Sequence, residues 1–499
     1  MLGIFFPIFP QFPKKSVRNL KKYPYLCIIV TNCINHYHLI MKIKTILIIL
    51  SLFSPLLLLS CKKDALAEVI TTGNIIPVIG KDTVTAPTNV FKRTISVGTG
   101  SGALTIDGKT LGLQCDDLIN IKSGTYTSID IKNILSKDGC PITIKNQDGI
   151  VKISGDFNQM ALTDLRNVTI SGDGTKGVEK GFVFRDNKYR AIQIQGTLNK
   201  FTLQHVSFVN IGDADIAYIY RAVYTGAEDS YSKDLKFLNI SCDNTQQFFA
   251  SNGAIENGNV LGLIKNLEIA NLDFRNSPSV GAVVYLGNVE DFNIHHNRVD
   301  NVNTSIDNHN GIFSISGNGR FHDNFVSNHQ GNAIRAWGFT VGTTAKTILI
   351  YNNIVVNSRK YSAFEVQAFD FNIIPGKTTY TDAIVFNNTC GNLNTSADWQ
   401  ANVVDVYSLK GGKCEVYNNL AYNFSGSIAI AGQEAELSPV TSNNLYFKTR
   451  GEAGLIDETE FKLNNNSSAK RAGRTTPIAI TDYYGAPRNQ NTPSLGAVE

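Results

Sequence analysis

The stretch ILIYNNIV, residues 348–355, carries the pattern that decides the fold: alternating hydrophobic residues, two asparagines, then more hydrophobic residues. Close copies follow as AIVFNNTC at 383–390 and CEVYNNLA at 414–421. Looser copies precede it and begin at residues 201, 235, 267, 292 and 319. The chain therefore repeats itself about every 25 to 35 residues, a period that is typical of solenoid proteins.

Each repeat shows the alternation of β-strands rather than the periodicity of helices. Short strands separated by Gly and Asn turns, about three per repeat, predict an all-β protein that consists of a single right-handed parallel β-helix. Successive coils of such a helix stack about 4.8 Å apart. We expect the β-helix at 101–430, and further coils with a closing segment at 431–499.

Alignment of the copies places polar residues in two adjacent columns. Stacked Asn side chains hydrogen-bond to one another and to turn backbone, and Asn tolerates the left-handed conformation of a corner. We therefore interpret both columns as structural. The first contains His205, Asn239, Asn271, His296, Asp323, Asn352, Asn387 and Asn418, and the second contains Asn297, Asn324, Asn353, Asn388 and Asn419.

The beginning of the chain has the features of an export signal. Met41 precedes two lysines, an apolar run at 45–59 and the pair Ser60–Cys61. This order is typical of a lipoprotein signal peptide, in which Cys61 is lipidated, and the apolar run is shorter than the roughly 20 residues of a membrane-spanning helix. We predict an extension upstream of the true initiator at 1–40, a signal peptide at 41–60 and a tether at 61–100.

Charge and cysteine usage agree with export. Seven of the 46 Lys and Arg residues lie within the first 60 positions, which hold no acid, so the remainder is slightly acidic and lacks a basic stripe for nucleic acid. Cys115 and Cys140 are candidates for a disulfide outside the cytoplasm. Cys242, Cys390 and Cys414 lie in strand-like runs and are expected to be small buried residues.

One column of aligned residues with outward-pointing side chains contains opposite charges. The coils GAVVYLG (281–287), GIFSISG (311–317) and NAIRAWG (332–338) align with one another. If Ile334 points inward, Arg335 points outward, because side chains alternate along a strand. Arg335 and Glu365 then become neighbours, and the simplest interpretation is a surface ion pair worth about 0–1 kcal/mol. The column contains Val284, Ser314, Arg335, Glu365 and Asp405.

Residues 116–156 contain IKSGTY, PITIKNQDG and VKISG in that order. This succession resembles the opening of the chondroitinase B and alginate lyase group, polysaccharide lyase family 6. The coiled region as a whole resembles the pectin-lyase-like β-helix superfamily. The closing stretch TDYYGAPRNQNTPSLGAVE, 481–499, is similar to the ends of many secreted bacterial β-helix proteins, and the lipobox followed by KKD is similar to that of Bacteroidetes-type lipoproteins.

The resemblance implies β-elimination on a uronate-containing polysaccharide. In that family the carboxylate is neutralised, often by Ca²⁺, a lysine takes the C5 proton and an arginine assists. The coil NAIRAWG places Arg335 on the family arginine. Ser316 stands where the resemblance implies the lysine, and NHNGIFS offers no carboxylate for the expected calcium ligands.

The same coils contain candidate residues for a site that differs from the one the resemblance implies. Trp337 can stack on a sugar ring, Arg335 can hold a carboxylate through two hydrogen bonds, and Lys360 or Tyr361 can serve as the base. Each also has a structural alternative as a turn residue or as surface cover, and so do Asp213 and Asp215, which are candidate calcium ligands. Further substrate-binding candidates are His309, His329, Arg359 and Glu365.

The sequence therefore predicts an exported, carbohydrate-active lipoprotein anchored to the outer membrane or surface of a Gram-negative bacterium. We expect a monomeric lyase that acts on an acidic polysaccharide, with Ca²⁺ as the one cofactor to consider. The alternative is a non-catalytic glycan-binding or surface-structural protein, because long solenoid faces bind ligands without chemistry. A hydrolase, which would need two carboxylates such as Glu365 and Asp405 across one cleft, is the third possibility.

Overall fold

The computed structural model describes residues 90–306, 308–407, 412–432, 438–457 and 459–499. The predicted upstream extension, the signal peptide, Cys61 and the tether up to residue 89 lie outside this range. No helix within the described residues is long and apolar enough to cross a membrane.

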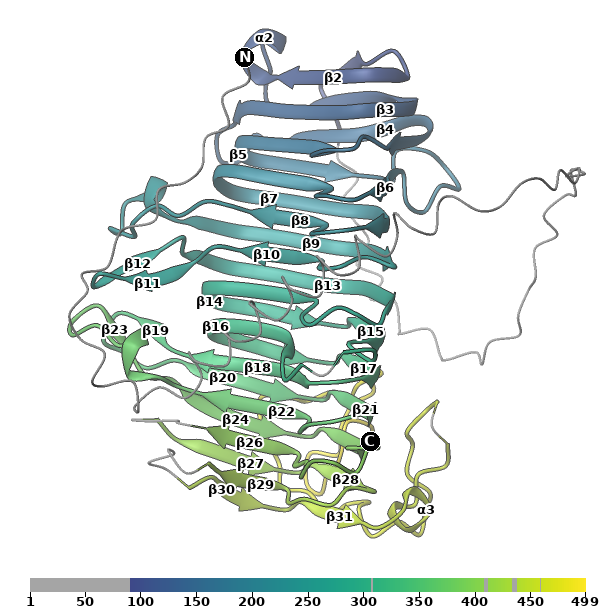
Figure 1. The fold of residues 1–499 in the computed structure, drawn as a ribbon, viewed down its shortest axis with the longest axis vertical. Coiled ribbons are helices and arrows are strands. Elements are labelled where there is room, and N and C mark those ends of the chain that lie inside the picture. Colours follow the sequence, from purple (N-terminus) through teal and green to yellow (C-terminus); the bar gives the residue numbers. More distant parts are fainter. Residues whose placement is uncertain (1–89, 307, 408–411, 433–437, 458) are drawn as a thin grey trace, which may run out of the picture. The chain divides into compact units, whose positions relative to one another are not determined.

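The described chain winds into stacked coils of parallel strands, as Figure 1 shows. Twenty-seven strands join into one coiled sheet. Its first half contains β1 (Arg93–Val97), β2 (Ser101–Asp107), β3 (Asp117–Leu135), β4 (Ile142–Ile153), β5 (Met160–Ser171), β6 (Phe182–Asn187), β7 (Ile192–Ile211), β8 (Ile216–Tyr218), β9 (Ser232–Asp243), β10 (Phe249–Ser251), β13 (Ile264–Ser277), β14 (Val284–His295) and β15 (Arg298–Val302).

In its second half, from β18 on, each coil has three short strands. This half contains β16 (Gly311–His322), β17 (Phe325–His329), β18 (Asn332–Gly338), β20 (Thr347–Tyr351), β21 (Ile354–Ser358), β22 (Phe364–Gln367), β24 (Asp382–Phe386), β25 (Thr389–Leu393), β26 (Val404–Tyr407), β27 (Cys414–Tyr417), β28 (Leu420–Tyr422), β29 (Ala429–Ala431), β30 (Val440–Ser442) and β31 (Leu445–Phe447). Two small antiparallel pairs stand apart, β11 (Ala254–Glu256) with β12 (Asn259–Leu261) and β19 (Thr340–Val341) with β23 (Thr378–Thr379).

Three columns of parallel strands run along the coils. One joins β18, β22, β26 and β29, a second joins β20, β24, β27 and β30, and a third joins β21, β25, β28 and β31. Crossovers between parallel strands are almost always right-handed, and the predicted right-handed parallel β-helix is confirmed. The interior is filled by aligned apolar residues, among them Phe313, Ile334, Phe364 and Val404.

Short helical turns occur only beside the coils in the described residues. They are α2 (Gly108–Leu111), η3 (Glu228–Ser230), η4 (Asp370–Asn372) and α3 (Arg450–Ala453). The coiling starts earlier than expected, because β1 already pairs with β3. The stretch expected to be a tether therefore ends before residue 93.

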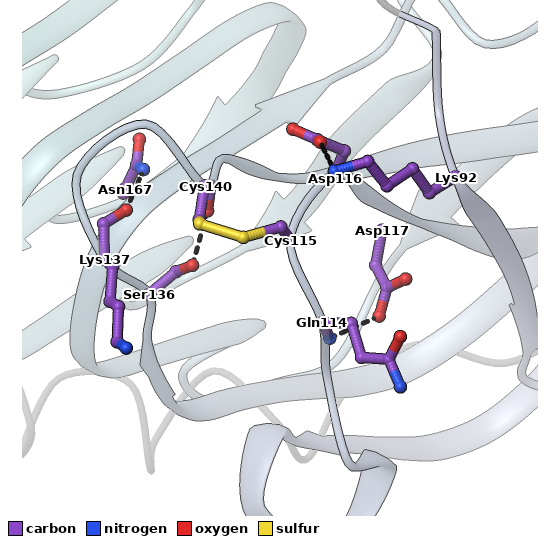
Figure 2. The surroundings of a disulfide bond; sticks show 9 residues. All are labelled: Lys92, Gln114, Cys115, Asp116, Asp117, Ser136, Lys137, Cys140 and Asn167. Atoms are coloured by element: carbon purple, nitrogen blue, oxygen red, sulfur yellow. Dashed lines mark hydrogen bonds and ion pairs between the residues drawn. A yellow bond between two sulfur atoms is a disulfide. The ribbon is translucent and has the colours of Figure 1, made fainter.

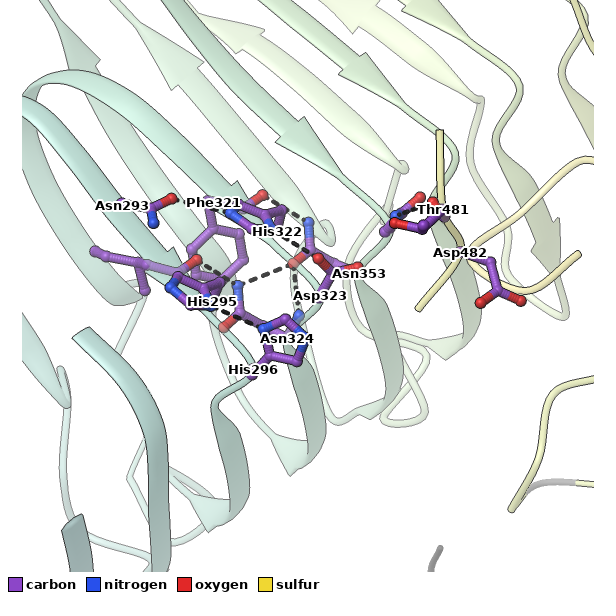
Figure 3. A network of polar contacts seen from close by, with 12 residues as sticks. Asn293, His295, His296, Phe321, His322, Asp323, Asn324, Asn353, Thr481 and Asp482 are labelled. Carbon is purple, nitrogen blue, oxygen red and sulfur yellow. Dashed lines mark hydrogen bonds and ion pairs between the residues drawn. The ribbon is translucent and has the colours of Figure 1, made fainter. Parts of the chain in front are cut away.

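The asparagine ladder is present as predicted. Each buried Asn donates its side-chain amide to the side-chain oxygen of the next, at 2.9 to 3.0 Å, and the same oxygen accepts the backbone amide of its predecessor (Figure 3). The ladder extends one coil further than the alignment indicated, to Asn444. Its members are Asn297, Asn324, Asn353, Asn388, Asn419 and Asn444.

The residue before each ladder asparagine forms the corner of the coil. His296, Asp323, Asn352, Asn387 and Asn418 all have a positive φ, between 53° and 56°. A non-glycine residue rarely adopts this conformation, and Asn and Asp adopt it most readily. The first column is therefore structural, as predicted from its composition.

Stacked rings lie next to this corner, where Tyr351, Phe386 and Tyr417 form a small core cluster of their own. The rings of His295 and His322 are parallel at 5.0 Å, and those of His322 and Tyr351 at 4.7 Å. The stack continues through Phe386 and Tyr417, where Arg474 of the closing segment lies 3.6 Å from the ring centre. After β31 the chain runs back along the coils, because Asn418 Nδ2 donates to the carbonyl oxygen of Arg474 and Asn352 Nδ2 donates to that of Thr481.

The cysteine predictions are confirmed. Cys115 and Cys140 form a disulfide that joins the chain ahead of β3 to the turn ahead of β4 (Figure 2). Cys242, Cys390 and Cys414 are free and buried. The disulfide therefore cross-links two of the first coils, which the asparagine ladder does not reach.

Candidate functional site

The outward column on the β14–β16–β18–β22–β26 face is largely as predicted. Its neighbours in register are Tyr285, Ser314, Arg335, Glu365 and Asp405. The prediction of Val284 is wrong, because Val284 pairs with Phe313 and is fully buried. Matching the glycines of the two coils shifted the alignment by one residue, whereas the core matches Val284 with another inward apolar residue.

Arg335 and Glu365 form an ion pair, with Nε 2.9 Å from Oε1 and Nη2 donating to Oε2 at 3.1 Å. The Glu365 side chain is 5% exposed and the Arg335 side chain 17%. The expectation of a surface pair is therefore wrong. The pair lies under cover because the turn ahead of β16 places His309 over it. Arg335 Nη1 also donates to the carbonyl oxygen of His309 at 3.1 Å.

His309 connects this ion pair to an aromatic group at the edge of the face. Its Nε2 lies 3.2 Å from Glu365 Oε2, and its ring stacks on Tyr361 with centroids 3.9 Å apart. Trp399, which is 49% exposed, meets the Tyr361 ring edge to face at 5.2 Å. Tyr361 itself is buried and has a φ of 79°, so a strained turn holds its ring in this position.

The two basic residues of the SRKYS turn are engaged in contacts. Lys360 Nζ lies 3.0 Å from Asp398 Oδ2, with Nζ also 5.6 Å from the Tyr361 ring centre. Arg359 Nη2 donates to the carbonyl oxygen of Ile306 at 2.8 Å. Lys360 and Tyr361 therefore lie in the same contact cluster as Arg335, whereas Arg359 ties two turns together.

Three further predicted site residues, His329, Asp213 and Asp215, also lie outside this cluster. His329 is fully buried on β17, and burial lowers its pKa to about 4, so it does not face a ligand. Asp213 forms an ion pair with Arg190 at 2.8 Å on the surface. Asp215 is fully buried, and burial raises the pKa of its carboxyl group well above the usual value. Asp213 and Asp215 therefore do not converge and do not fit a shared calcium ion.

No group of three or more His, Cys, Asp or Glu side chains in the described part of the chain could hold a metal ion. Ca²⁺ stays a prediction, because its usual ligands also include Asn side chains and backbone carbonyl oxygens.

Glu365 and Asp405 are adjacent on neighbouring strands, but their pKa values are shifted in opposite directions. Burial by itself would raise the pKa of Glu365, yet hydrogen bonding to His309 and the charge of Arg335 outweigh it and hold that pKa below the usual value. Burial raises the pKa of Asp405, and the nearby Glu365 carboxylate adds to this effect. Two adjacent carboxyl groups with opposite shifts are the arrangement from which acid and base pairs arise.

A pocket of about 200 Å³ lies on the same face, and its lining comes from β18, the strand of Arg335, and from β16 and β14. Tyr285 and Phe371, which are 48% and 62% exposed, and Trp337 provide aromatic walls. Ser314 and Ser316 lie on β16 beside them. Trp337, which was predicted to stack on a sugar, thus lines a real recess.

Two loops border this pocket. The hairpin of β11 and β12 contributes Ala254, and the loop that contains η4 contributes Phe371. Lys377 Nζ donates to the carbonyl oxygen of Gly258 at 2.7 Å, which joins the two loops. The loop that contains η4 therefore borders the pocket through Phe371 and Asn372.

Sequence reasoning missed Trp399, Tyr285, Phe371 and Asp398. Their only signal was composition, since three are aromatic residues in turns or at strand positions that are otherwise polar. Which of them meet could not be read from the repeat, because Phe371 and Trp399 lie in loops that occur in one coil each.

No family model and no curated protein matches the chain. Solved structures similar to it include pectate lyase Pel9A, at 12% identity over 81% of this chain and 97% of that one, with a TM-score of 0.33. An alginate lyase from Paenibacillus sp. str. FPU-7 is 14% identical over 71% of this chain and 99% of that one (TM-score 0.36). A PL6 family polysaccharide lyase from Pseudopedobacter saltans is 12% identical over 72% and 93%, respectively (TM-score 0.34).

The similarity concerns the fold. The right-handed parallel β-helix is shown by the pairing of the chain's own strands, as predicted from the sequence.

Proposed function

We propose that this chain is an exported carbohydrate-active protein that binds a polysaccharide on the β14–β16–β18–β22–β26 face. The observation that carries the proposal is the pocket with aromatic walls from Tyr285, Trp337 and Phe371. Large amphipathic rings with hydroxyl groups between them suit a sugar, which has apolar faces and a polar rim. Trp399, farther along the face, offers a second exposed ring.

The localisation of the protein at the outer membrane is part of the same proposal. A lipid on Cys61 would hold the chain at the outer membrane, and the stretch between Cys61 and β1 would let the β-helix reach a polymer. The described residues neither include Cys61 nor contain a helix that could span the membrane. Metabolic labelling with a palmitate analogue, compared between the native chain and Cys61→Ser, checks this part.

Binding is tested by affinity electrophoresis of the full chain, purified in detergent, through gels that contain alginate, pectate, chondroitin, xylan or chitosan. We expect retardation by at least one polymer, and at least tenfold weaker binding after Tyr285→Ala. Tyr446→Ala is the matched control, because Tyr446 is similarly exposed at 44% but lies on β31, outside this face. Unchanged mobility in every gel would refute the proposal.

Elimination on an acidic polysaccharide is the second candidate function. The observation that favours it is the convergence of Arg335, Lys360 and Tyr361 around His309. In that reaction a base removes the C5 proton, the bond from C4 to the departing oxygen breaks, and a C4–C5 double bond forms. The charge of Arg335 is already balanced by Glu365, so the resting arrangement supports binding more strongly than elimination.

The ultraviolet absorbance of unsaturated uronate distinguishes the two functions. A lyase gives a rising signal that Lys360→Met or Tyr361→Phe abolishes without unfolding the chain. Binding in the gels without any absorbance change would leave the protein as a binding module.

A further inference from the structure

The pocket beside Trp337 lacks charge, which limits what it can bind. None of its described lining residues is Asp, Glu, Lys, Arg or His. Basic groups on the bordering strand and loops are engaged: Arg335 pairs with Glu365, Lys377 donates to the backbone of the hairpin, and Arg221 pairs with Glu256. A carboxylate in this pocket would lose water without gaining a cation, which costs free energy.

The floor of the pocket is bare backbone. Gly253 and Gly287 lie on adjacent coils, and a Cβ on either would come within 2.0 Å of the carbonyl oxygen of the other. Both positions therefore require glycine. The recess that results, about 200 Å³, is smaller than the about 300–1,000 Å³ of sites for drug-sized molecules. It suits one sugar ring rather than a length of chain.

The walls carry unused hydrogen-bond donors. Trp337 Nε1 and Asn372 Nδ2 are buried and have no partner among the described residues. Asn372 is 3% exposed and lines the pocket. Buried donors are nearly always paired, and leaving one unpaired costs about 1–3 kcal/mol. A ligand oxygen that displaces the local cover would satisfy them, and such a ligand must present an acceptor.

Resting on the proposed binding function, we propose that this pocket is a subsite for one uncharged sugar ring that carries an acyl oxygen, such as an N-acetyl group. The aromatic rings of Tyr285 and Phe371 contact the apolar faces of the ring, and the acyl oxygen accepts from Trp337 and Asn372. The polysaccharide would then contain uncharged acylated residues and would not be a pure polyuronate.

The chain contains only two tryptophans, which makes the pocket observable. In a Trp399→Phe background, fluorescence reports Trp337 alone. The probes are tri-N-acetylchitotriose, its non-acetylated counterpart chitotriose and trigalacturonate. We expect tri-N-acetylchitotriose to shift Trp337 emission with an affinity at least tenfold above that of the other two.

Phe371→Ala tests whether the Phe371 ring, which forms one wall of the pocket, contributes to binding. Phe157→Ala is the matched control. Both phenylalanines are mostly exposed, at 62% and 68%, and each stacks on one other ring, but Phe157 contacts Tyr189, far from the pocket. We expect the first substitution to weaken binding of tri-N-acetylchitotriose at least tenfold and the second to leave it unchanged.

Other outcomes separate this inference from the proposed function. Equal or tighter binding of trigalacturonate at Trp337 would overturn the uncharged subsite and leave polysaccharide binding intact. Polymer retardation in the gels without any change in Trp337 emission would also overturn it. Failure of both the trisaccharides and the polymers would overturn the proposed function as well.

Discussion

The asparagine ladder and the outward column that contains Arg335 both run along the β-helix, yet they are built in opposite ways. In the ladder every coil repeats the same residue, and each side chain hydrogen-bonds to its counterpart in the next coil. In the outward column each coil has a different residue, in the order Tyr, Ser, Arg, Glu and Asp. Repetition therefore marks a structural role, and its absence marks the face where a ligand can be recognised.

The two columns also differ in how their polar groups are satisfied. Asn353 is fully buried, yet its side chain makes four hydrogen bonds, so no charge is needed. Arg335 and Glu365 are covered by His309, which comes from a turn rather than from a strand. The ladder is thus held by the fold itself, whereas the ion pair depends on a neighbouring loop.

The largest expected effect is at Arg335. Arg335→Ala leaves the Glu365 carboxylate buried without its cation, and removing one partner of a buried pair costs about 3–5 kcal/mol. We expect a loss of this size in the free energy of unfolding, measured by urea denaturation with circular dichroism. A loss below about 1 kcal/mol would mean that the pair behaves as an exposed one.

A double substitution separates folding from function. Arg335→Met with Glu365→Leu replaces the ion pair by apolar side chains of similar size, a change that is often close to neutral for stability. We expect most of the stability lost in Arg335→Ala to return. Because this variant folds, any loss of polysaccharide binding or elimination in it is attributable to the missing charges and not to unfolding.

The sequence predicted the repeating parts of the molecule and not the contacts between loops. Five ladder positions and the Arg335–Glu365 register followed from aligned coils. Asn444 was missed because the strand ahead of it, Val440–Ser442, lacks the alternating apolar residues of its counterparts. The burial of Glu365 was missed because periodicity places a residue on a face but does not say what a turn lays over it.

An intermediate effect is expected in the ladder. Asn353→Ala removes the oxygen that serves the backbone and side-chain amides of Asn324, and the amide that serves Phe321 and Asn388. At about 0.5–1 kcal/mol for each of the four hydrogen bonds, the lower part of the usual range, we expect the free energy of unfolding to fall by about 2–4 kcal/mol in the same urea experiment.

Asn423→Gly is the control for the ladder. The exposed Asn423 makes one side-chain bond, to Asn392, and its φ of 50° suits glycine. We expect Asn423→Gly to lower the free energy of unfolding by less than about 1 kcal/mol. Equal losses for Asn353→Ala and Asn423→Gly would show that burial of the ladder adds nothing to its stability.

The smallest effect is a change in pH dependence at Asp405. Its pKa is raised in the folded chain by burial and by the Glu365 carboxylate, so the folded state binds this proton more tightly than the unfolded state does. The corresponding stability is present below the ordinary Asp pKa of about 3.9 and is lost as pH rises through the raised value. Glu365, with its lowered pKa, acts in the opposite direction and loses stability as pH falls.

Asp405→Asn should therefore remove the decline in stability above about pH 4 and leave the acid-side loss that Glu365 causes. Thermal unfolding of both chains between acid and neutral pH measures this. Asn at 405 keeps the shape of the side chain, and Asn402 Nδ2 can still donate to its oxygen as it does to Asp405 at 2.7 Å. Parallel profiles for the two chains would contradict a raised pKa at Asp405, and with it the opposite pKa shifts of Asp405 and Glu365 that distinguish this column from the uncharged ladder.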